Sequence, residues 1–424
     1  MLEKSTYKAY LAILKEELIP ATGCTEPIAI AYCAAKMRGL LGRMPERIEA
    51  AVSGNILKNV KSVVVPNTDG LKGIPAAVAL GIVAGRAEKE LQVIAEVSEA
   101  QKQETADYLK NVPIHIRCSE TPCILDIALT GYAQGHSACV RIANNHTNIV
   151  YMSRDGEVLL ERAVAASSED SMQDKRVLNV ADIVEFADTV DIEALAPLIR
   201  PQIVLNSAIA ERGLKEGWGA QLGKTMLTED GDDIKNEAKA YAAAGSDARM
   251  SGCELPVVIL SGSGNQGITA SLPVIRYSRH IGATEEQMYR ALAVSDLVTV
   301  HQKTGIGRLS AYCGAVSAGA GAGAGIAYLL GAGVEGVACT IRNAVAILSG
   351  TICDGAKASC AAKIALAVDA GITGYQMFKN NHNFQGGDGI VGTDVEDSIA
   401  CVGLLASKGM RETDRVILEI MTRC

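Results

Sequence analysis

The stretch SAYCGAVSAGAGAGAGIAYLLGAG, residues 310–333, alternates glycine with alanine. Each glycine inside a helix costs about 0.5–1 kcal/mol relative to alanine, so a helix here needs compensation from its neighbours. One interpretation is a central helix that other helices approach closely because it has no bulky side chains. The alternative is a glycine-rich turn whose backbone approaches a ligand. Cys313 lies at the leading edge of the tract in both.

Working outward from this tract, helical periodicity covers most of the chain after residue 180. Predicted helices there span residues 181–190, 196–213, 233–250 and 284–303. The first 42 residues predict two further helices, the second capped by Thr25 and stopped by Gly42.

Between these regions the pattern changes to short β-rich runs, interrupted by a predicted helix over residues 74–90. The runs are 48–52, 62–65, 91–97, 113–118, 124–130, 137–143, 148–153 and 157–161. NNHTN and RDGE resemble hairpin connections, so the later runs predict an antiparallel meander.

The predicted fold class is therefore α+β, with a helix-rich C-terminal catalytic half and a smaller β-rich N-terminal domain. We expect three units: residues 1–45 as N-terminal helices packing on the catalytic domain, 46–165 as an α+β domain, and 181–424 as the helical catalytic domain. The polar residues 166–180 form the expected boundary.

Composition narrows the function classes. The chain has 424 residues, of which 48% are hydrophobic, and its 40 basic and 48 acidic residues give a net charge of −8. This balance argues against nucleic acid as a partner. The N-terminus lacks the features of a signal peptide, and the apolar segments 315–333 and 334–352 make no convincing membrane span. We expect a cytoplasmic protein with no membrane partner.

Twelve cysteines then need an explanation, because disulfides are rare in a reducing compartment. Most are expected to be small buried hydrophobes, as at Cys33, Cys139, Cys339 and Cys401. Three others, Cys24, Cys313 and Cys353, directly precede predicted helices, where free N–H groups and the helix dipole favour the thiolate. Three thiolates from separate segments suggest a three-ligand site, which in a cubane iron–sulfur cluster leaves one iron open for substrate.

Five ordered motifs carry a resemblance across nearly the whole chain. They are EELIPATGCTEPIAIAYCAAK, SGNILKNVKSVVVPN, GSGNQGITASLPV, KTGIGRLSAYCGA and TICDGAKASCAAK. Together they resemble the L-cysteine desulfidase family, relatives of the α domain of iron–sulfur L-serine dehydratases. The resemblance implies a 4Fe-4S cluster held by three cysteines and a non-redox β-elimination of L-cysteine to pyruvate, ammonia and hydrogen sulfide. The motif cysteines fall on Cys24, Cys313 and Cys353. Cys360, expected two turns inside a helix, is the nearest competitor.

This chemistry requires pockets for the substrate carboxylate and ammonium, and a base for the Cα proton. For the carboxylate we single out Ser263, Asn265 and Gln266, in SGSGNQG, as a backbone anion nest. Asn55, Lys58 and Asn59 form a second polar group in SGNILKNVKS. The pattern of Gly262, Gly264 and Gly267 also matches a dinucleotide motif, but no acidic strand end follows about twenty residues later. An ordinary tight turn and a surface lysine are the structural alternatives.

For the base we favour Lys303, ten residues before Cys313, with His301 and His382 as alternatives. Glu26 is a candidate for holding the substrate ammonium, and Ser310 for a hydrogen bond near the cluster. In related dehydratases the C-terminal cysteine occupies the open iron, which makes Cys424 a candidate inhibitory tail.

Several alternatives remain open at this stage. L-serine dehydratase is the nearest, because the two substrates differ by one atom. An iron–sulfur redox sensor and a metal-free structural protein are the alternatives from other classes. A homodimer is the expected assembly.

Overall fold

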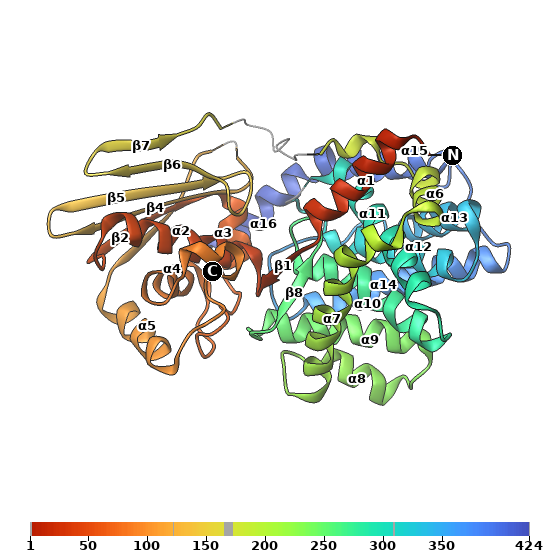
Figure 1. Ribbon diagram of the computed structural model, residues 1–424, viewed down its shortest axis with the longest axis horizontal. Helices are drawn as coiled ribbons and strands as arrows, with labels where there is room; N and C mark the ends of the chain where they lie inside the picture. The colour runs from red at the N-terminus through yellow and green to blue at the C-terminus, as the bar shows by residue number, and fades with distance from the viewer. Residues whose placement is uncertain (1, 122, 165–172, 308–309, 424) are drawn as a thin grey trace.

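The computed structural model describes residues 2–121, 123–164, 173–307 and 310–423, which form two parts joined side by side (Figure 1). Its strands are β1 (Ile19–Thr22), β2 (Arg47–Val52), β3 (Ile114–Cys118), β4 (Asp126–Ala133), β5 (His136–Ala143), β6 (Ile149–Arg154), β7 (Glu157–Glu161) and β8 (Pro256–Ile259). The predicted α+β class is confirmed. Residues 165–172, which include the first part of the polar boundary segment, lie outside the described residues.

Helices make up the rest of the regular structure. In the first 215 residues they are α1 (Lys4–Glu17), α2 (Thr25–Leu41), α3 (Gly54–Val60), α4 (Gly73–Val83), α5 (Glu99–Asn111), α6 (Val180–Thr189) and α7 (Ile192–Lys215). The later ones are α8 (Leu222–Glu229), α9 (Ile234–Met250), α10 (Gly264–His280), α11 (Glu285–Ile306), α12 (Gly314–Leu329), α13 (Gly333–Ile347), α14 (Cys360–Lys379), α15 (Val395–Leu404) and α16 (Arg411–Arg423). Three short turns complete the inventory: η1 (Ala87–Gln92), η2 (Lys175–Val177) and the π-helical η3 (Leu405–Gly409).

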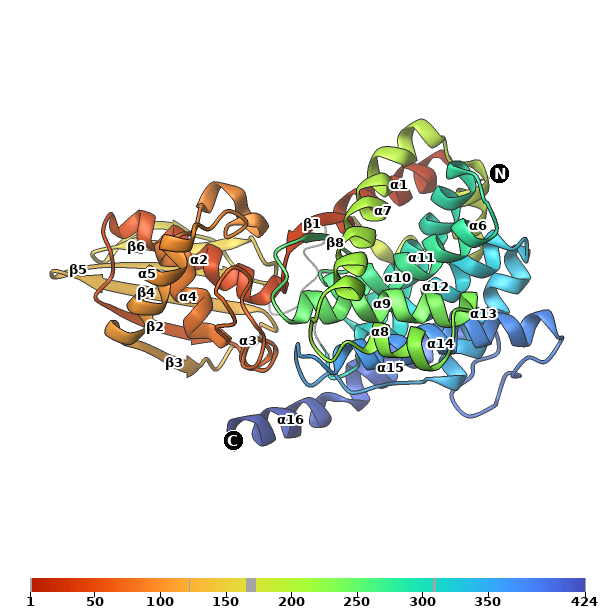
Figure 2. The same cartoon turned by 90° about the horizontal axis from the view of Figure 1, so that it is seen from below.

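The N-terminal part is a six-stranded sheet in the order β3-β2-β4-β5-β6-β7. Only β2 and β3 are parallel, and the remaining neighbours are antiparallel, as predicted for the later strands. Helix α2 packs on β4 and β5, α4 packs on α2, and α5 packs on α4. Figure 2 shows these helices on one face of the sheet, where their apolar residues form a common core.

The helical half is built around α12, the alanine–glycine tract. It packs against α10, α11, α13 and α14. A Cβ on Gly319 would lie 2.2 Å from the Ala367 carbonyl oxygen of α14, and one on Gly323 would lie 2.5 Å from the Gly371 oxygen. The central-helix interpretation is therefore confirmed: these glycines let backbones touch, and the resulting close packing compensates their low helix propensity.

The first 45 residues do not form one unit. Helix α1 packs on α7 and α11 of the helical half, β1 pairs antiparallel with β8, and α2 then enters the core of the N-terminal sheet. The expectation that both N-terminal helices pack on the catalytic half is wrong for α2. The division of the chain into domains remains a prediction.

Two predicted strands, 62–65 and 91–97, are not formed. The first contributes only an isolated bridge between Val64 and Lys72, and the second overlaps the turn η1. Their apolar residues, including Val63 and Ile94, are buried in the core beneath the sheet. A continuous apolar run therefore marked burial rather than strand pairing.

In the N-terminal part, helices α3 and α5 were not predicted. Helix α5 has few apolar residues but begins with a capping box between Ser98 and Gln101.

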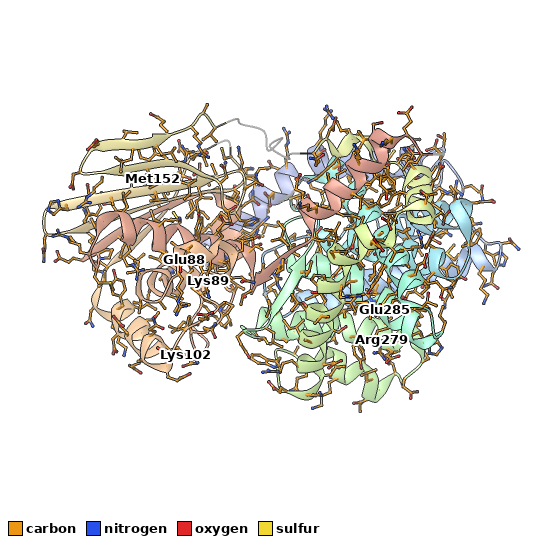
Figure 3. The ribbon with its side chains drawn as sticks, in the orientation of Figure 1. Glu88, Lys89, Lys102, Met152, Arg279 and Glu285 are labelled. Atoms are coloured by element: carbon orange, nitrogen blue, oxygen red, sulfur yellow. The ribbon has the colours of Figure 1, made fainter. Side chains whose placement is uncertain are left out.

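Charged residues such as Glu88, Arg279 and Glu285 lie on the outer surface (Figure 3). In the described part of the chain, no helix is long and apolar enough to cross a membrane.

Candidate active site

One pocket lies where the two parts meet, at the N-terminal ends of α2, α10, α12 and α14. All but two of the predicted site residues line it: Cys24, Glu26, Asn59, Ser263, Asn265, Gln266, Lys303, Ser310, Cys313 and Cys353. Segments separated by more than 300 residues therefore meet at one place. The two exceptions are Asn55 and Lys58.

Four cysteines contribute to this pocket. Cys24 is the N-cap of α2 and Cys313 the N-cap of α12, so both lie at helix starts as predicted, although the N-cap predicted for α2 was Thr25. Cys353 lies in a loop beside Cys313, because the Cys353 amide donates to the Ala311 carbonyl (2.6 Å) and the Cys313 amide donates to the Thr351 carbonyl (2.8 Å). The fourth, Cys360, lines the same pocket.

The predicted helix directly after Cys353 is wrong, because α14 starts at Cys360. Residues 354–359 form a turn instead, in which Asp354 is ion-paired with both Lys357 and Lys363. Cys360 is thus the first residue of a helix rather than two turns inside one, and Cys353 gains no helix dipole.

Burial opposes ionisation of the thiols of Cys24 and Cys313. Burial raises the pKa of Cys24 to about 12, although Arg249 acts in the opposite direction. Burial, followed by the neighbouring Cys353, raises the pKa of Cys313 to about 12. The expectation that a helix start favours the thiolate is therefore wrong here, since desolvation outweighs the dipole. Metal binding at these thiols would release protons.

The donor set fits an iron–sulfur cluster. Within the described ranges, no three His, Cys, Asp or Glu side chains lie close enough together to hold a single metal ion. A cubane cluster instead takes one thiolate on each of several irons, so it needs cysteines that are spread around a cavity. The four pocket thiols come from three segments, with Cys353 and Cys360 at the two ends of one of them, and have this arrangement.

Polar side chains occupy the wall next to Cys24. The Asn59 amide donates to a Glu26 carboxylate oxygen (3.1 Å), and the Thr25 hydroxyl donates to the Gly262 carbonyl (2.9 Å). The other end of the Asn59 amide, Oδ1, is buried without a hydrogen-bond partner in the described chain. Glu26 is thus held in place, with a neighbouring amide oxygen able to accept a bond from a ligand.

The SGSGNQG segment is the turn from β8 into α10. Ser261 and Gly262 have positive φ angles of 49° and 76°, and Ser263 is the helix N-cap. Strand β8 pairs only with the antiparallel β1, so the βαβ unit that a dinucleotide motif requires is missing from the described residues. The buried Gln266, whose Oε1 has no partner among the described residues, completes this side of the pocket.

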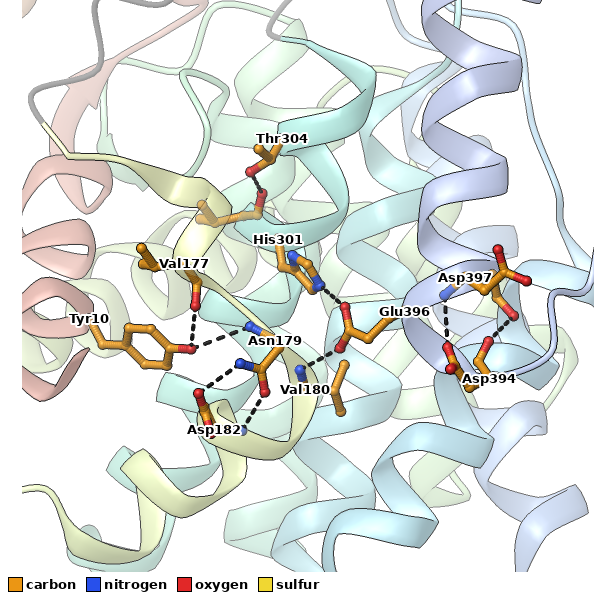
Figure 4. Close-up of polar contacts among 12 residues, drawn as sticks. Tyr10, Val177, Asn179, Val180, Asp182, His301, Thr304, Asp394, Glu396 and Asp397 are labelled. Atoms are coloured by element: carbon orange, nitrogen blue, oxygen red, sulfur yellow. Dashed lines mark hydrogen bonds and ion pairs between the residues drawn. The ribbon is translucent and has the colours of Figure 1, made fainter. Parts of the chain in front are cut away.

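Lys58 and the histidines are placed elsewhere. Lys58 is 2% exposed and forms an ion pair with Asp414 of α16. His301 Nε2 lies 2.6 Å from Glu396, which also accepts from the Val180 amide (2.7 Å), as Figure 4 shows. His382 follows the end of α14, on the surface. None of these three side chains lines the pocket.

Sequence reasoning missed several lining residues, notably Asn144, His146, Arg249 and Tyr312. Arg249 is 3% exposed, at the end of the alanine-rich α9. The sequence signal that could have revealed it is that Arg249 is the one basic residue in AYAAAGSDARM, a stretch made mostly of small and apolar residues. Asn144 and His146 belong to the hairpin loop NNHTN, which sequence reasoning used only as a turn.

Comparisons with known proteins agree with this picture. Residues 88–419 match the family model described as serine dehydratase alpha chain. The chain is similar to a UPF0597 protein of Desulfitobacterium hafniense, with 55% identity over 98% of this chain and 96% of that protein. It is also 45% identical to a UPF0597 protein of Treponema denticola, over 100% of this chain and 99% of the relative. The family match begins after Cys24, whereas both relatives cover it.

Proposed function

The chain belongs to the serine dehydratase alpha chain family, and on that premise we propose that it is an iron–sulfur-dependent lyase acting on L-cysteine. The products would be pyruvate, ammonia and hydrogen sulfide. The observation that carries the proposal is the single pocket in which four thiols meet Glu26, Lys303 and the polar start of α10.

The proposed cluster ligands are Cys24, Cys313 and Cys353, with Cys360 as the competitor for the third place. When bound, a 4Fe-4S cluster with an open iron supplies a Lewis acid for the departing sulfur, which is a soft donor. The protein supplies the remaining functions.

Glu26 lies beside Cys24 and is oriented by the Asn59 amide. A carboxylate fixed in this way suits the substrate ammonium. Ser263, Asn265 and Gln266 line the pocket at the start of α10, where free backbone N–H groups favour an anion such as the substrate carboxylate. The substrate is therefore held at two points on neighbouring walls.

Lys303, in the last turn of α11, is buried and lines the pocket. We assign it the Cα proton. As that proton moves to the Lys303 nitrogen, the C–H electron pair forms the Cα–Cβ double bond and the Cβ–S pair leaves with sulfur, which takes up a proton as hydrogen sulfide. The resulting enamine tautomerises and water releases ammonia, so no oxidant or reductant is consumed.

Serine dehydration is the second candidate, because the family description names serine. The same residues serve both reactions, and only the leaving group differs. A soft iron site with a sulfur leaving group favours cysteine, which is why we place it first.

The test is anaerobic purification with iron and sulfide reconstitution, followed by assays of pyruvate and sulfide from L-cysteine and of pyruvate from L-serine. We expect cysteine turnover in the wild type and its loss, together with the cluster absorbance, in Cys313→Ala. Cys401→Ala, outside the pocket, is the matched control and should retain both. Comparing Cys353→Ala with Cys360→Ala identifies the third ligand.

A reconstituted cluster without turnover of either amino acid would favour a sensor instead. Failure to bind any cluster under these conditions would remove the proposed mechanism.

A further inference from the structure

Arg249 is a buried cation with no carboxylate partner. Its Nε donates to the Gly23 carbonyl (3.0 Å) and its Nη1 donates to Asn265 Oδ1 (3.0 Å). Both acceptors are neutral, and in the described part of the chain Arg249 forms no ion pair. A buried charge without a counter-ion is strongly unfavourable, so this guanidinium indicates an anion that the protein chain itself does not provide.

Two partly buried arginines elsewhere in the fold have carboxylate partners. Arg141 makes two bonds to the buried Asp126, and Arg276 on α10 is paired with Glu237. Arg249 therefore differs from these two arginines: it is more deeply buried, and its printed hydrogen bonds go only to neutral acceptors.

The fold holds Arg249 against the start of α10. A Cβ on Gly264, the first residue of α10, would lie 2.3 Å from Arg249 Nε and 2.7 Å from its Cζ. Ser263, the N-cap, makes no side-chain capping bond to the helix. The guanidinium and the N-terminal end of a 17-residue helix thus line the same pocket, and both favour negative charge.

A second unpartnered group lies beside them. Gln266, in the first turn of α10, is 5% exposed and its Oε1 has no hydrogen-bond partner among the described residues. Its amide packs against Gly314, next to Cys313, where a Cβ would lie 2.6 Å from Nε2. The Gln266 amide therefore lies between the guanidinium side of the pocket and the thiols.

We propose that Arg249 and the first turn of α10 bind the α-carboxylate of the amino-acid substrate, and so make the pocket select amino acids over the corresponding amines and amides. This assignment rests on the proposed function. It gives Arg249 the role that Lys58 was expected to have, and makes Asn265 a positioning residue that holds the guanidinium.

The rival role for Arg249 is support of Cys24, since the guanidinium lies near enough to oppose the rise in the pKa of that thiol. The two roles differ in what they require of a ligand. Carboxylate binding depends on the ligand's charge, whereas support of Cys24 depends on the cluster.

The experiment measures binding of 3-mercaptopropionate and of its uncharged amide by calorimetry, with cluster-free and reconstituted protein. The proteins are wild type, Arg249→Gln, Arg249→Lys and the control Arg276→Gln. We expect wild type to prefer the carboxylate by on the order of 10- to 100-fold, the size of a charge-assisted bond. Arg249→Gln should lose this preference and Arg276→Gln should keep it.

Arg249→Lys keeps the charge but not the forked geometry, so it should fold and retain only part of the preference. Iron content of the reconstituted variants and their circular dichroism are recorded in parallel. A preference that survives in Arg249→Gln, or a wild type without any preference, overturns the carboxylate assignment. Loss of iron with an unchanged preference overturns it in favour of the Cys24 role.

The outcome is separable from that of the proposed function. If the wild type releases no sulfide but its carboxylate preference depends on Arg249, the carboxylate site stands and the desulfidase assignment fails. If sulfide is released while the Arg249 variants bind both ligands like wild type, only the present inference fails.

Discussion

The two sides of the pocket are held by different forces. On the helical side, α12 meets α14 backbone to backbone, with Gly319 and Gly323 against carbonyl oxygens of the neighbouring helix. The N-terminal side joins the helical half through the short β1–β8 ladder, the Thr25–Gly262 bond and the Lys58–Asp414 ion pair. Close packing therefore fixes one wall, whereas a few polar contacts position the other against it.

The two sides also differ in how a buried ionisable side chain is accommodated. Lys58, on the N-terminal side, has Asp414 as its counter-ion. Asp296, in the middle of α11, is fully buried and receives a single hydrogen bond from the Gln202 amide (3.0 Å). Asp296 needs no cation as a partner because burial raises its pKa to about 7, so the carboxyl can stay protonated and neutral.

The largest effect is expected from Gly319→Ala. A methyl group 2.2 Å from the Ala367 oxygen would force α12 and α14 apart, and we expect a loss of about 3 kcal/mol or more in the free energy of unfolding. The matched control is Gly39→Ala, on an exposed position of α2 with open space around it. It should gain about 0.5–1 kcal/mol from helix propensity.

Urea unfolding followed by circular dichroism measures both changes. Similar midpoints for the two variants would mean that the α12–α14 contact is not as close as described, and the contrast between the two walls would disappear.

The next effect is a pH dependence from Asp296. Burial raises the pKa of this carboxyl to about 7, from 3.8 when unfolded. Between these values the folded protein binds more protons than the unfolded chain, so stability falls as pH rises from about 4 to about 7 and is level above. The total is at most about 4 kcal/mol.

Asp296→Asn keeps the bond with Gln202 and removes the ionisation. We expect it to be more stable than wild type at pH 8 and closer to wild type at pH 5, whereas the exposed Asp230→Asn should follow wild type at both. Urea midpoints at the two pH values measure this. A wild-type stability that rises between pH 5 and pH 8 in an Asp296-dependent way would contradict the assigned direction.

The contrast between local packing and long-range polar contacts also explains which features could be predicted from the sequence. The helix at 314–329, the hairpins of the sheet and the helix starts at Cys24 and Cys313 follow from local patterns, and they were predicted. The carboxylate that pairs with Lys58 lies 356 residues away, so no local pattern could reveal it. The strand predictions for residues 62–65 and 91–97 were wrong because a run of apolar residues indicates burial but does not show that the segment pairs with another strand.

Cys24, Cys313, Cys353 and the residues at the start of α10 were selected from the sequence because they occur in local motifs, and they line the pocket. Arg249 was missed because the alanine-rich α9 gives no indication of which pocket its last turn faces. Cys360 was placed too deep in a helix because the ion pairs of Asp354, which stabilise the preceding turn, involve side chains whose contacts depend on the fold.

The smallest effect on global stability is expected from the polar contact between α3 and α16. Among the described elements, α16 packs mainly on α3 and η3, and Lys58 is buried beneath it. Asp414→Asn leaves the Lys58 charge without its partner. Since α16 packs on so few elements, Lys58 can regain water when the helix detaches, which limits the cost to the docking energy of α16.

We therefore expect Asp414→Asn to lose hydrogen-exchange protection in residues 411–421, with the global free energy of unfolding changed by less than about 1 kcal/mol. Glu412→Gln, on the exposed side of the same helix, should leave that protection unchanged. Because α3 also carries Asn59, which orients Glu26, detachment of α16 should loosen the N-terminal wall and leave α12 unaffected. Equal protection of α16 in both variants, or a loss of protection that spreads to α12, would show that the two walls are not held independently.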